Sequence, residues 1–216
     1  MAKELNLDIV ANEILAHLRE HASEIVSGSL LSSPRVVGDA VQEYLAERGL
    51  PEVLAKYGIS VRDEFSKRAM EDMAFKDSRS NYYAVDVKTH NVDTQFNMPN
   101  LISVRRLATF YKNDDKNNFC ILIISYNVVN GKLNYSECHF KRIESFDWSC
   151  LTLGALGWGQ IQIANANKLF FVEQTSRKSW MLSLCDKLEA FYDEEIGKIG
   201  ERKLWFSNIK DYWENR

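Results

Sequence analysis

Asp86 and Lys88 lie two residues apart in the segment Asn81–Asn91, whose aromatic and β-branched residues predict a strand. Because alternate side chains of a strand share a face, Asp86 and Lys88 point together, while Val85 and Val87 point to the other face and into a core. A carboxylate beside an ammonium on one strand face is typical of metal-dependent phosphodiester chemistry when a second carboxylate lies nearby. The sequence therefore predicts one chemical face and one core face for this strand.

Asp72 supplies the second carboxylate if the chain folds back at the polar turn Asp77–Asn81. A hairpin centred on Arg79 pairs residues whose numbers sum to 158, which sets Asp72 opposite Asp86. Directly opposed like charges destabilise a strand pair, and a divalent cation would remove that penalty. Magnesium prefers one or two carboxylates together with water and phosphate oxygens. Lys88 would then orient the attacking water or offset the charge that develops on the phosphorus.

The triplet acid-x-Lys by itself carries little information, because the chain also contains it at Asp114–Lys116 and Glu201–Lys203. These two copies fall in a polar loop and in a charged helical region. Of the three copies, Asp86 is the one on a predicted strand with a partner. The alternative interpretation of the hairpin is a solvent face with two acids and a lysine in a salt-bridge cluster. The spacing alone does not decide between the two.

Four segments form a series along the chain: Asp72, Asp86-Val87-Lys88-Thr89, Pro99-Asn100-Leu101-Ile102-Ser103 and Gln160-Ile161-Gln162. Together they resemble the PD-(D/E)XK family of type II restriction endonucleases. The likeness covers about residues 36–166 and is closest over residues 72–108. Glu71 stands where the family commonly has a proline before the first aspartate, a departure that the family tolerates.

This resemblance implies an α/β fold with a restriction-endonuclease-like central mixed β-sheet flanked by α-helices. It also implies a Mg2+-dependent enzyme that cuts both strands of DNA at a specific site by phosphodiester hydrolysis. Asp72, Asp86 and Val87 would bind the metal ion, and Asp72, Asp86 and Lys88 would be catalytic. Glu43, on the helix before the hairpin, is a further catalytic candidate, with a surface glutamate as the alternative. The implied partners are double-stranded DNA, a second copy of the chain on a palindromic site, and a cognate DNA methyltransferase.

Two segments are expected to read the DNA sequence, at about residues 89–100 and 152–166. Amide side chains both donate and accept hydrogen bonds, as reading of an adenine edge requires. In the second segment three glycines flank Trp158 beside two glutamines, and glycine allows close approach of the backbone. A bulged core strand with a buried Trp158 is the alternative there. The candidates for DNA contact are Thr89, Asn91, Gln95, Asn97, Asn100, Gln160 and Gln162, among which the resemblance singles out Asn100.

Composition fits a single globular domain over residues 1–216, with the catalytic hairpin at about 70–89, because no Gly/Ser/Pro-rich linker divides the chain. No apolar run approaches the ~20 residues of a membrane span. The four cysteines form no Cys-x-x-Cys pair, as expected of reduced core thiols in a cytoplasmic protein. A net charge of -3 argues mildly against a nucleic-acid binder. Acids gathered at a metal site and on C-terminal helices can nevertheless leave a locally basic cleft.

Apolar periodicity predicts the remaining elements. A helix that begins at Pro99 would direct its N-terminus toward the site, where free N–H groups favour a phosphate. The apolar residues of the last two helices would serve packing or a dimer seam. The predicted helices are Leu5–Val26, one capped by Ser33 and ended by Gly49, Pro99–Lys112, Ser179–Ile196 and Leu204–Trp213, and the predicted strands are Phe119–Val129 and Leu133–Phe140, joined by the hairpin dipeptide Asn130-Gly131.

Other functions remain open on the sequence. His17, Glu20 and His21 match the H-x-x-E-H pattern, in which histidines four apart on a helix hold zinc and the glutamate acts as a base. A solvated helix face explains these residues equally, and a measurement of zinc content distinguishes the two. The remaining alternatives to a restriction enzyme are a DNA repair or nicking nuclease of the same fold and a non-enzymatic DNA-binding relative.

Overall fold

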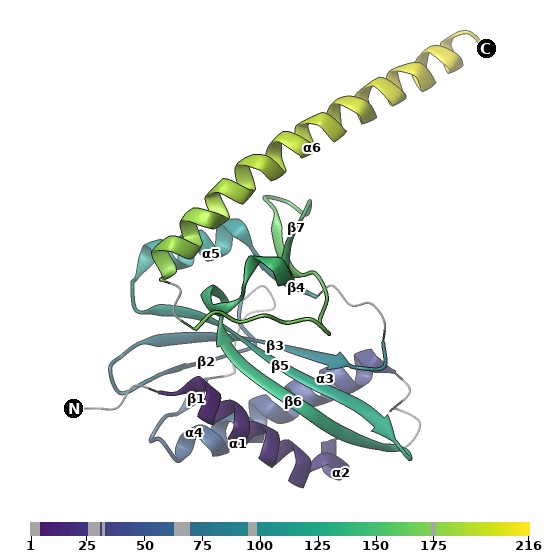
Figure 1. The fold of residues 1–216 in the computed structure, drawn as a ribbon. Helices are drawn as coiled ribbons and strands as arrows, with labels where there is room; N and C mark the ends of the chain where they lie inside the picture. The colour runs from purple at the N-terminus through teal and green to yellow at the C-terminus, as the bar shows by residue number, and fades with distance from the viewer. Residues whose placement is uncertain (1–4, 26–30, 32, 63–69, 95–98, 174–175) are drawn as a thin grey trace.

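The centre of the molecule is a five-stranded mixed sheet in the order β1-β2-β3-β5-β6 (Figure 1). The computed structural model describes residues 5–25, 31, 33–62, 70–94, 99–173 and 176–216. Strands β3 and β5 run parallel, and the other neighbouring pairs run antiparallel. Helices flank this sheet, so the predicted α/β architecture is confirmed. The strands are β1 (Val61–Arg62), β2 (Met73–Lys76), β3 (Tyr82–Asn91), β5 (Asn117–Val129) and β6 (Lys132–Arg142).

Both predicted hairpins form in this sheet. In the β2–β3 hairpin Met73 pairs with Val85, so the predicted register, with paired numbers summing to 158, is confirmed. The β5–β6 hairpin turns at Asn130 and Gly131, whose φ angles are 51° and 68°. A tight two-residue hairpin of this type requires positive φ at both central residues, which asparagine and glycine tolerate best.

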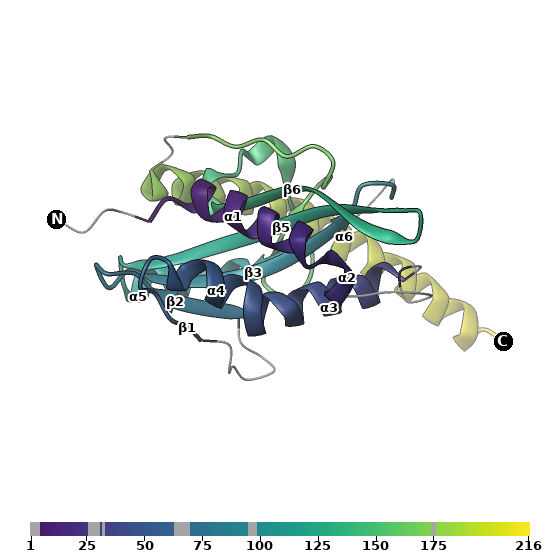
Figure 2. The ribbon, with the colours of Figure 1, turned by 90° about the horizontal axis from the view of Figure 1, so that it is seen from below.

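One face of the sheet is covered by the N-terminal helices, as Figure 2 shows from below. Their apolar residues form one core with the lower faces of β2, β3, β5 and β6. The predicted helix Leu5–Val26 is interrupted after Glu20, and Val26 lies outside the described residues. The predicted cap is confirmed, since the Ser33 hydroxyl accepts a hydrogen bond from the Val36 N–H at 3.4 Å. The helices are α1 (Leu7–Glu20), α2 (Ala22–Ile25), α3 (Pro34–Tyr44), a π-helical segment (Leu45–Gly49) and α4 (Leu50–Ala55).

The prediction that Gly49 ends the second helix is wrong. Gly49 has a right-handed helical φ of -59°, and the chain continues through it into α4. Pro51 directly follows the π-helical segment Leu45–Gly49, where the regular α-helical hydrogen-bond pattern is interrupted. A Cβ on residue 49 would lie 2.9 Å from Leu45 Cδ2, so the glycine serves close packing and not a stop.

The opposite face of the main sheet is covered by a second, three-stranded sheet in the order β4-β8-β7, by helix α5 and by the start of α6. The predicted helix Pro99–Lys112 is correct only in its second part. Residues Asn100–Ser103 form a strand, because Asn100 and Ser103 pair with β8, and the helix begins at Val104. These elements are β4 (Asn100–Ser103), α5 (Val104–Asn113), β7 (Leu151–Gly154) and β8 (Gln160–Ile163), with short 3-10 turns at Ile143–Ser145 and Trp148–Cys150.

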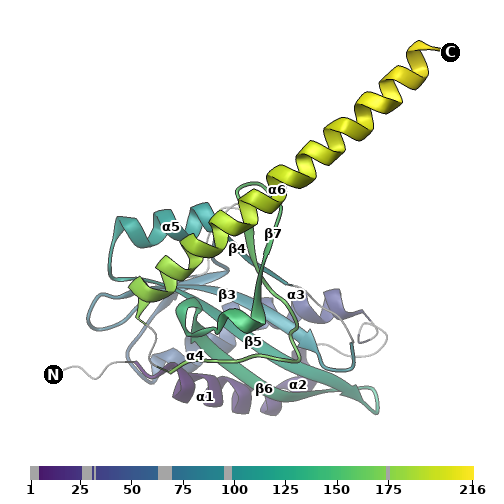
Figure 3. The same cartoon turned by 45° about the horizontal axis from the view of Figure 1, so that its top comes forward.

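The C-terminal helix α6 (Arg177–Glu214) is continuous over 38 residues, so the two separate helices predicted there are wrong. Gly197 and Gly200 each weaken a helix by about 1 kcal/mol relative to alanine, which is insufficient to break it here. The helix crosses the second sheet and α5 and then projects beyond the body of the protein (Figures 1 and 3). Among the described helices none is both long and apolar enough to cross a membrane.

The first turns of α6 are fixed to the body by a buried ionic network. Glu144 is buried, and it accepts hydrogen bonds from Tyr111 Oη at 2.7 Å and from Arg177 Nε at 3.2 Å. The same arginine donates to Asn118 Oδ1 at 2.9 Å and lies 4.3 Å from the centre of the Tyr111 ring. Trp180, one turn later, is buried and donates to the Phe146 carbonyl oxygen at 3.2 Å. Arg177 therefore joins α6, α5 and β5.

We expect Arg177→Met to lower the free energy of unfolding by about 3–5 kcal/mol, because it leaves the Glu144 carboxylate buried without its cation. Arg48→Met is the matched control. Arg48 pairs with Glu24 and Glu52 on the surface, and such exposed pairs contribute about 0–1 kcal/mol. Urea denaturation of both variants measures the difference. Similar losses in the two variants would contradict this role for Arg177.

Candidate active site

Strand β3 places Asp86 and Lys88 on the face that looks toward the second sheet. Val85 and Val87, on the alternate positions, belong to the core beneath, so the predicted separation of Asp86 and Lys88 from the core face is confirmed. Asp86 is 8% exposed, and its Oδ1 lies 2.7 Å from the Lys88 ammonium. The carboxylate and the cation are therefore neighbours in a largely buried position.

Asp72 comes immediately before β2 and extends its pairing with β3. Its N–H donates to the Val85 carbonyl at 2.9 Å, and its Oδ2 accepts from the Val87 N–H at 2.7 Å. The turn that sets this register is closed by Asp77, whose Oδ1 accepts from the N–H groups of Arg79 and Asn81, both at 2.9 Å. Local turn chemistry thus brings Asp72 beside the strand that carries Asp86.

The orientation of the Val87 carbonyl group follows from these hydrogen bonds. The N–H and C=O of a strand residue point to the same neighbouring strand. The Val87 N–H points to Asp72, so the Val87 carbonyl group points to the same side of β3 as β2. Strand β2 begins only at Met73, after Asp72. Val87 can therefore add a carbonyl oxygen to the two carboxylates.

The environment of Asp86 is costly for a negative charge. Burial raises the pKa of Asp86 to about 7, the Lys88 ammonium lowers it in part, and the neighbouring Asp72 carboxylate raises it. Its second oxygen, Oδ2, is buried and finds no hydrogen-bond donor among the described residues. A buried acceptor without a partner costs about 1–3 kcal/mol, and more when it is charged. A cation at this oxygen would remove the cost.

The donors present fit a hard divalent cation. Asp72, Asp86 and the Val87 carbonyl offer oxygen atoms only, as Mg2+ prefers. Within the described ranges no group of three or more His, Cys, Asp or Glu side chains gathers around one point. Two carboxylates are sufficient for Mg2+, which commonly keeps several waters and takes phosphate oxygens from its substrate.

A cavity of about 400 Å³ opens above these carboxylates. Its walls come from the main sheet, from β4 and α5, and from the loop between β7 and β8. Arg106 adds a positive charge to the wall, and a neighbouring cavity of about 630 Å³ continues along α5 past Arg105 and Arg106. The lining residues of the first cavity are Met70, Asp72, Asp86, Leu101, Ile102, Ser103, Arg106, Leu156, Gly157, Trp158 and Gln160.

Three of the predicted DNA-reading residues lie together on the second sheet. Asn100 pairs with Gln162 in the β4–β8 register, and Gln162 Nε2 donates to Asn100 Oδ1 at 2.5 Å. Gln160 lies two positions before Gln162 on the same face of β8, while Ile161 and Ile163 are buried. A Cβ at Gly154 would lie 2.8 Å from Gln162 Oε1, so the glycine allows this glutamine to lie across β7. The result is a polar face beside the cavity.

The other predicted site residues do not join this group. Thr89 lies on the opposite side of β3, where its Oγ1 is next to Gly38 of α3. Asn91 Oδ1 accepts from the Asp93 N–H at 3.0 Å and so closes the turn after β3. Glu43 is exposed on α3, the helix that packs on the core face of β3. Gln95 and Asn97 lie outside the described residues.

His17 and His21, at the C-terminal end of α1, are engaged in helix packing. His17 Nε2 lies 2.9 Å from the Tyr44 hydroxyl, and His21 Nδ1 lies 3.0 Å from the His17 carbonyl oxygen. The two rings stack with their centres 4.4 Å apart. Desolvation by burial lowers the pKa of His17. These contacts explain both histidines without a metal ion.

Sequence analysis missed the part of the wall formed by Leu156 and Trp158. Trp158 is 60% exposed, so its predicted alternative of a buried core position is wrong. Positive φ angles at Gly157 (62°) and Gly159 (99°) turn the backbone so that the indole projects outward. The Arg105 guanidinium lies 4.9 Å from the centre of the ring. The glycines around Trp158 did locate this loop, in the recognition segment predicted at about residues 152–166, but that prediction chose the glutamines and not Leu156 or Trp158.

Comparisons with known proteins give no family assignment. No protein-family model matches the chain, and no curated protein matches it significantly. The fold is similar to a Holliday junction resolvase from Archaeoglobus fulgidus, at 15% identity over 54% of this chain and 86% of that one, with a TM-score of 0.34. It is also similar to the NlaIV restriction endonuclease, at 15% identity over 76% of this chain and 70% of that one, with a TM-score of 0.47. The function therefore has to follow from the site.

Asp86 should make the stability of the metal-free protein depend on pH. A carboxyl group whose folded pKa is raised holds a proton that the unfolded chain has already released, so stability falls as pH rises from about 4 to about 7. We expect Asp86→Asn to abolish this contribution. The difference in melting temperature between the variant and the native protein should therefore increase, in favour of the variant, as pH rises. Thermal melting at about pH 5 and pH 8 with a chelator measures the gain. A gain that is equal at the two pH values would contradict the assignment.

Proposed function

We propose that this protein is a Mg2+-dependent endonuclease that hydrolyses phosphodiester bonds of double-stranded DNA at a specific site. The observation that carries the proposal is the Asp86 carboxylate, which is buried at the base of an open cavity with Lys88 on one oxygen and no donor on the other. Buried polar atoms usually have a hydrogen-bond partner. A cation bound at the second oxygen would supply that partner.

The residues of the site have separable roles in such a reaction. Asp72, Asp86 and the Val87 carbonyl would hold the metal ion. When bound, Mg2+ supplies Lewis-acid polarisation of the phosphate and a more acidic water. The Lys88 ammonium would offset negative charge at the phosphorus and fix the position of the water. One P–O bond forms to the water oxygen, and the opposite P–O ester bond breaks to give a phosphate monoester and an alcohol.

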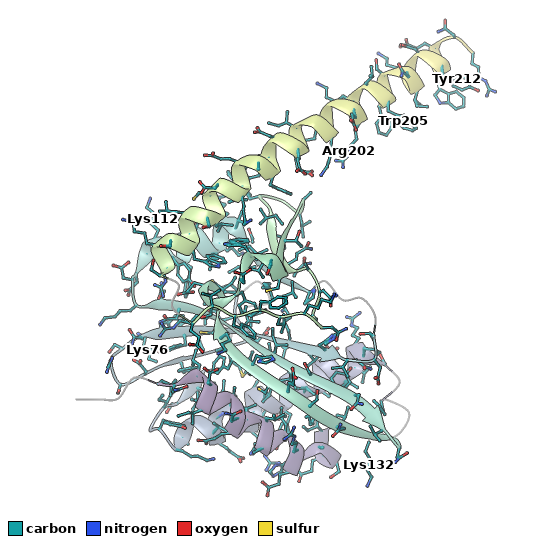
Figure 4. The ribbon with its side chains drawn as sticks, in the orientation of Figure 1. Lys76, Lys112, Lys132, Arg202, Trp205 and Tyr212 are labelled. Atoms are coloured by element: carbon teal, nitrogen blue, oxygen red, sulfur yellow. The ribbon has the colours of Figure 1, made fainter. Side chains whose placement is uncertain are left out.

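The charges around the cavity support a polyanionic substrate despite the net charge of -3. Arg106 lines both cavities, and Arg105 lines the second. Lys112 lies further along α5 (Figure 4). Arg106, which shares the cavity with the carboxylates, and the other cations of α5 can position a phosphate backbone, because phosphate contacts fix the register of a protein on DNA.

Sequence reading is proposed for the Asn100 and Gln162 pair, with Gln160 beside it. A two-stranded ribbon fits the major groove, and an amide can make a bidentate contact with adenine. The hydrogen bond between Asn100 and Gln162 orients both amides before DNA arrives. DNA contact remains a prediction from the sequence for Thr89, Asn91, Gln95 and Asn97. A catalytic role remains a prediction for Glu43.

A homodimer on a palindromic site is part of the proposal. One chain carries one set of Asp72, Asp86 and Lys88 and can cut one strand, so two-fold symmetry supplies the second cut. A cognate DNA methyltransferase would then protect the host genome. The finer likeness of the motif series to HincII, on the EcoRV branch of the family, favours blunt ends. A complex of one chain with one duplex that only nicks would instead indicate a repair nuclease of the same fold.

We expect Asp86→Ala to abolish Mg2+-dependent DNA cleavage while the melting temperature does not fall, because the substitution removes a metal ligand and a like-charge contact. Lys88→Ala should also stop cleavage but leave DNA binding in Ca2+ largely intact. Lys141→Ala is a matched control, since Lys141 is ion-paired with Asp8 at 2.6 Å and its side chain is 23% exposed, as that of Lys88 is. Cleavage by Asp86→Ala, or equal loss of binding and cleavage in Lys88→Ala, would refute these roles.

Asn100→Ala should weaken discrimination between the target and single-base variants of it, since a bidentate amide contact with adenine contributes about 1–3 kcal/mol. Asn134→Ala is the control, because Asn134 makes a similar amide pair with Asn127 on the β5–β6 hairpin. Competition gel shifts in Ca2+ measure both. Equal losses of affinity for target and random DNA would reassign Asn100 to backbone contact or folding.

A further inference from the structure

Two large apolar side chains are exposed at the rim of the active-site cavity. Leu156 and Trp158 are 69% and 60% exposed, and both line the cavity that also holds Asp72 and Asp86. They belong to the loop that joins β7 to β8, which projects from the second sheet beside α6 (Figures 1 and 3). The hydrolysis proposed above uses neither side chain, so it does not explain why they stand exposed beside the cavity.

The conformation of this loop is fixed by two neighbouring helices. The Val104 N–H, at the start of α5, donates to the Gly159 carbonyl oxygen at 3.1 Å. From α6, the Tyr192 hydroxyl donates to the Trp158 carbonyl oxygen at 2.5 Å. The Arg105 guanidinium lies 4.9 Å from the centre of the indole ring, a distance at which a cation is attracted to the ring face. The indole is therefore held in position before a ligand binds.

The loop is the tip of the ribbon whose amides are proposed to read DNA. Gln160 follows Trp158 by two residues and lines the same cavity. Residues two apart in an extended chain are separated by about 7 Å, which is about two base steps of 3.4 Å. A base pair that reaches Gln160 therefore brings itself or a near neighbour within reach of Trp158.

The major groove offers one apolar group to a side chain of this kind. In an intact duplex the faces of the bases are stacked on one another, so a protein reaches only their edges. Among the major-groove edges, hydrogen-bond donors and acceptors alternate with the C5-methyl group of thymine. Leu156 has no hydrogen-bonding group in its side chain, and Trp158 has a single donor. The thymine methyl is therefore the group that these two side chains complement.

Thymine is also the base that accompanies the proposed reading of adenine. The amides of Asn100, Gln160 and Gln162 suit an adenine edge, and the thymine paired with that adenine presents its methyl group in the same groove. One ribbon that carries amides along its strand and apolar side chains at its tip can contact both bases of an A·T pair, or two neighbouring A·T pairs.

We infer that Leu156 and Trp158 contact the C5-methyl group of a thymine and so determine part of the DNA sequence that the protein reads. The inference rests on the proposed function, because it requires the second sheet to lie in the major groove. It adds two apolar side chains to the polar residues proposed above for specificity. It also predicts that the bound sequence contains at least one A·T pair.

Replacement of thymine by uracil tests the contact, because uracil lacks only the methyl group. Selection from a random-sequence duplex pool in Ca2+ first identifies the bound sequence without any cleavage. Competition gel shifts then compare the selected duplex with the same duplex made with uracil. The native protein should bind the uracil duplex about fourfold more weakly for each contacted methyl group, the effect of burying about one such group. A selected sequence without an A·T pair, or equal affinity for the two duplexes, would overturn the inference.

A double variant links the methyl group to the loop. Leu156→Ala with Trp158→Ala should bind the thymine and uracil duplexes alike, with an unchanged melting temperature because both side chains are exposed. Leu204→Ala with Trp205→Ala is the matched control, since Leu204 and Trp205 are 65% and 58% exposed on α6. Figure 4 shows Trp205 on the projecting part of that helix. The control should keep the preference for thymine, and a loop variant that also keeps it would refute the role of the loop.

This inference and the nuclease proposal fail in different ways. A thymine preference that depends on the loop, in a protein that cuts no DNA in Mg2+, would contradict the nuclease proposal alone. Mg2+-dependent cleavage at one sequence, with equal affinity for the two duplexes, would overturn the thymine contact alone. A pool from which no sequence is enriched would overturn both the contact and the proposed reading of sequence.

Discussion

The Asp86 carboxylate is held in a buried position, with the Lys88 ammonium 2.7 Å from one oxygen and no hydrogen-bond donor for the other among the described residues. Every element around the site contributes to this arrangement. Strand alternation turns Asp86 away from the core of Val85 and Val87, and the hairpin register brings Asp72 beside it. Residues of β4, of α5 and of the loop between β7 and β8 form the other walls of the cavity beside the carboxylate. Burial and a neighbouring acid both raise the pKa of Asp86, so the fold disfavours the charged form of this carboxyl group and Lys88 offsets that cost only in part.

The parts of this arrangement that could be predicted from the sequence are those with local causes. The β2–β3 register follows from alternating apolar residues and from a turn that Asp77 closes, so the apposition of Asp72 and Asp86 was accessible without a structure. The Asn130-Gly131 turn has the same kind of cause. The pairing of Asn100 with Gln162 depends on residues 62 apart, and no local pattern predicts it. Family resemblance pointed to those residues, but only the fold shows that their amides bond to each other.

Predictions failed where tertiary packing outweighs local preference. Asn100–Ser103 has apolar residues at spacings that also suit a helix, and the partner strand β8 makes it a strand. Gly49 was expected to end a helix, and Gly200 falls between the two helices predicted in the C-terminal segment. Both glycines lie inside helices, Gly49 because Leu45 packs against it. Because α6 is continuous, the apolar side chains of its projecting part are exposed, and no other element that the structure describes covers them. A periodicity shows which side of a helix is apolar, but it does not show what covers that side.

The most direct test of the account is digestion of a plasmid of known sequence with the purified protein, with and without Mg2+, followed by sequencing of the ends. The account predicts cleavage that requires Mg2+ and ends that all map to one short palindromic sequence, cut on both strands. Ends scattered over the plasmid, or an intact plasmid in Mg2+ at every protein concentration, would contradict it.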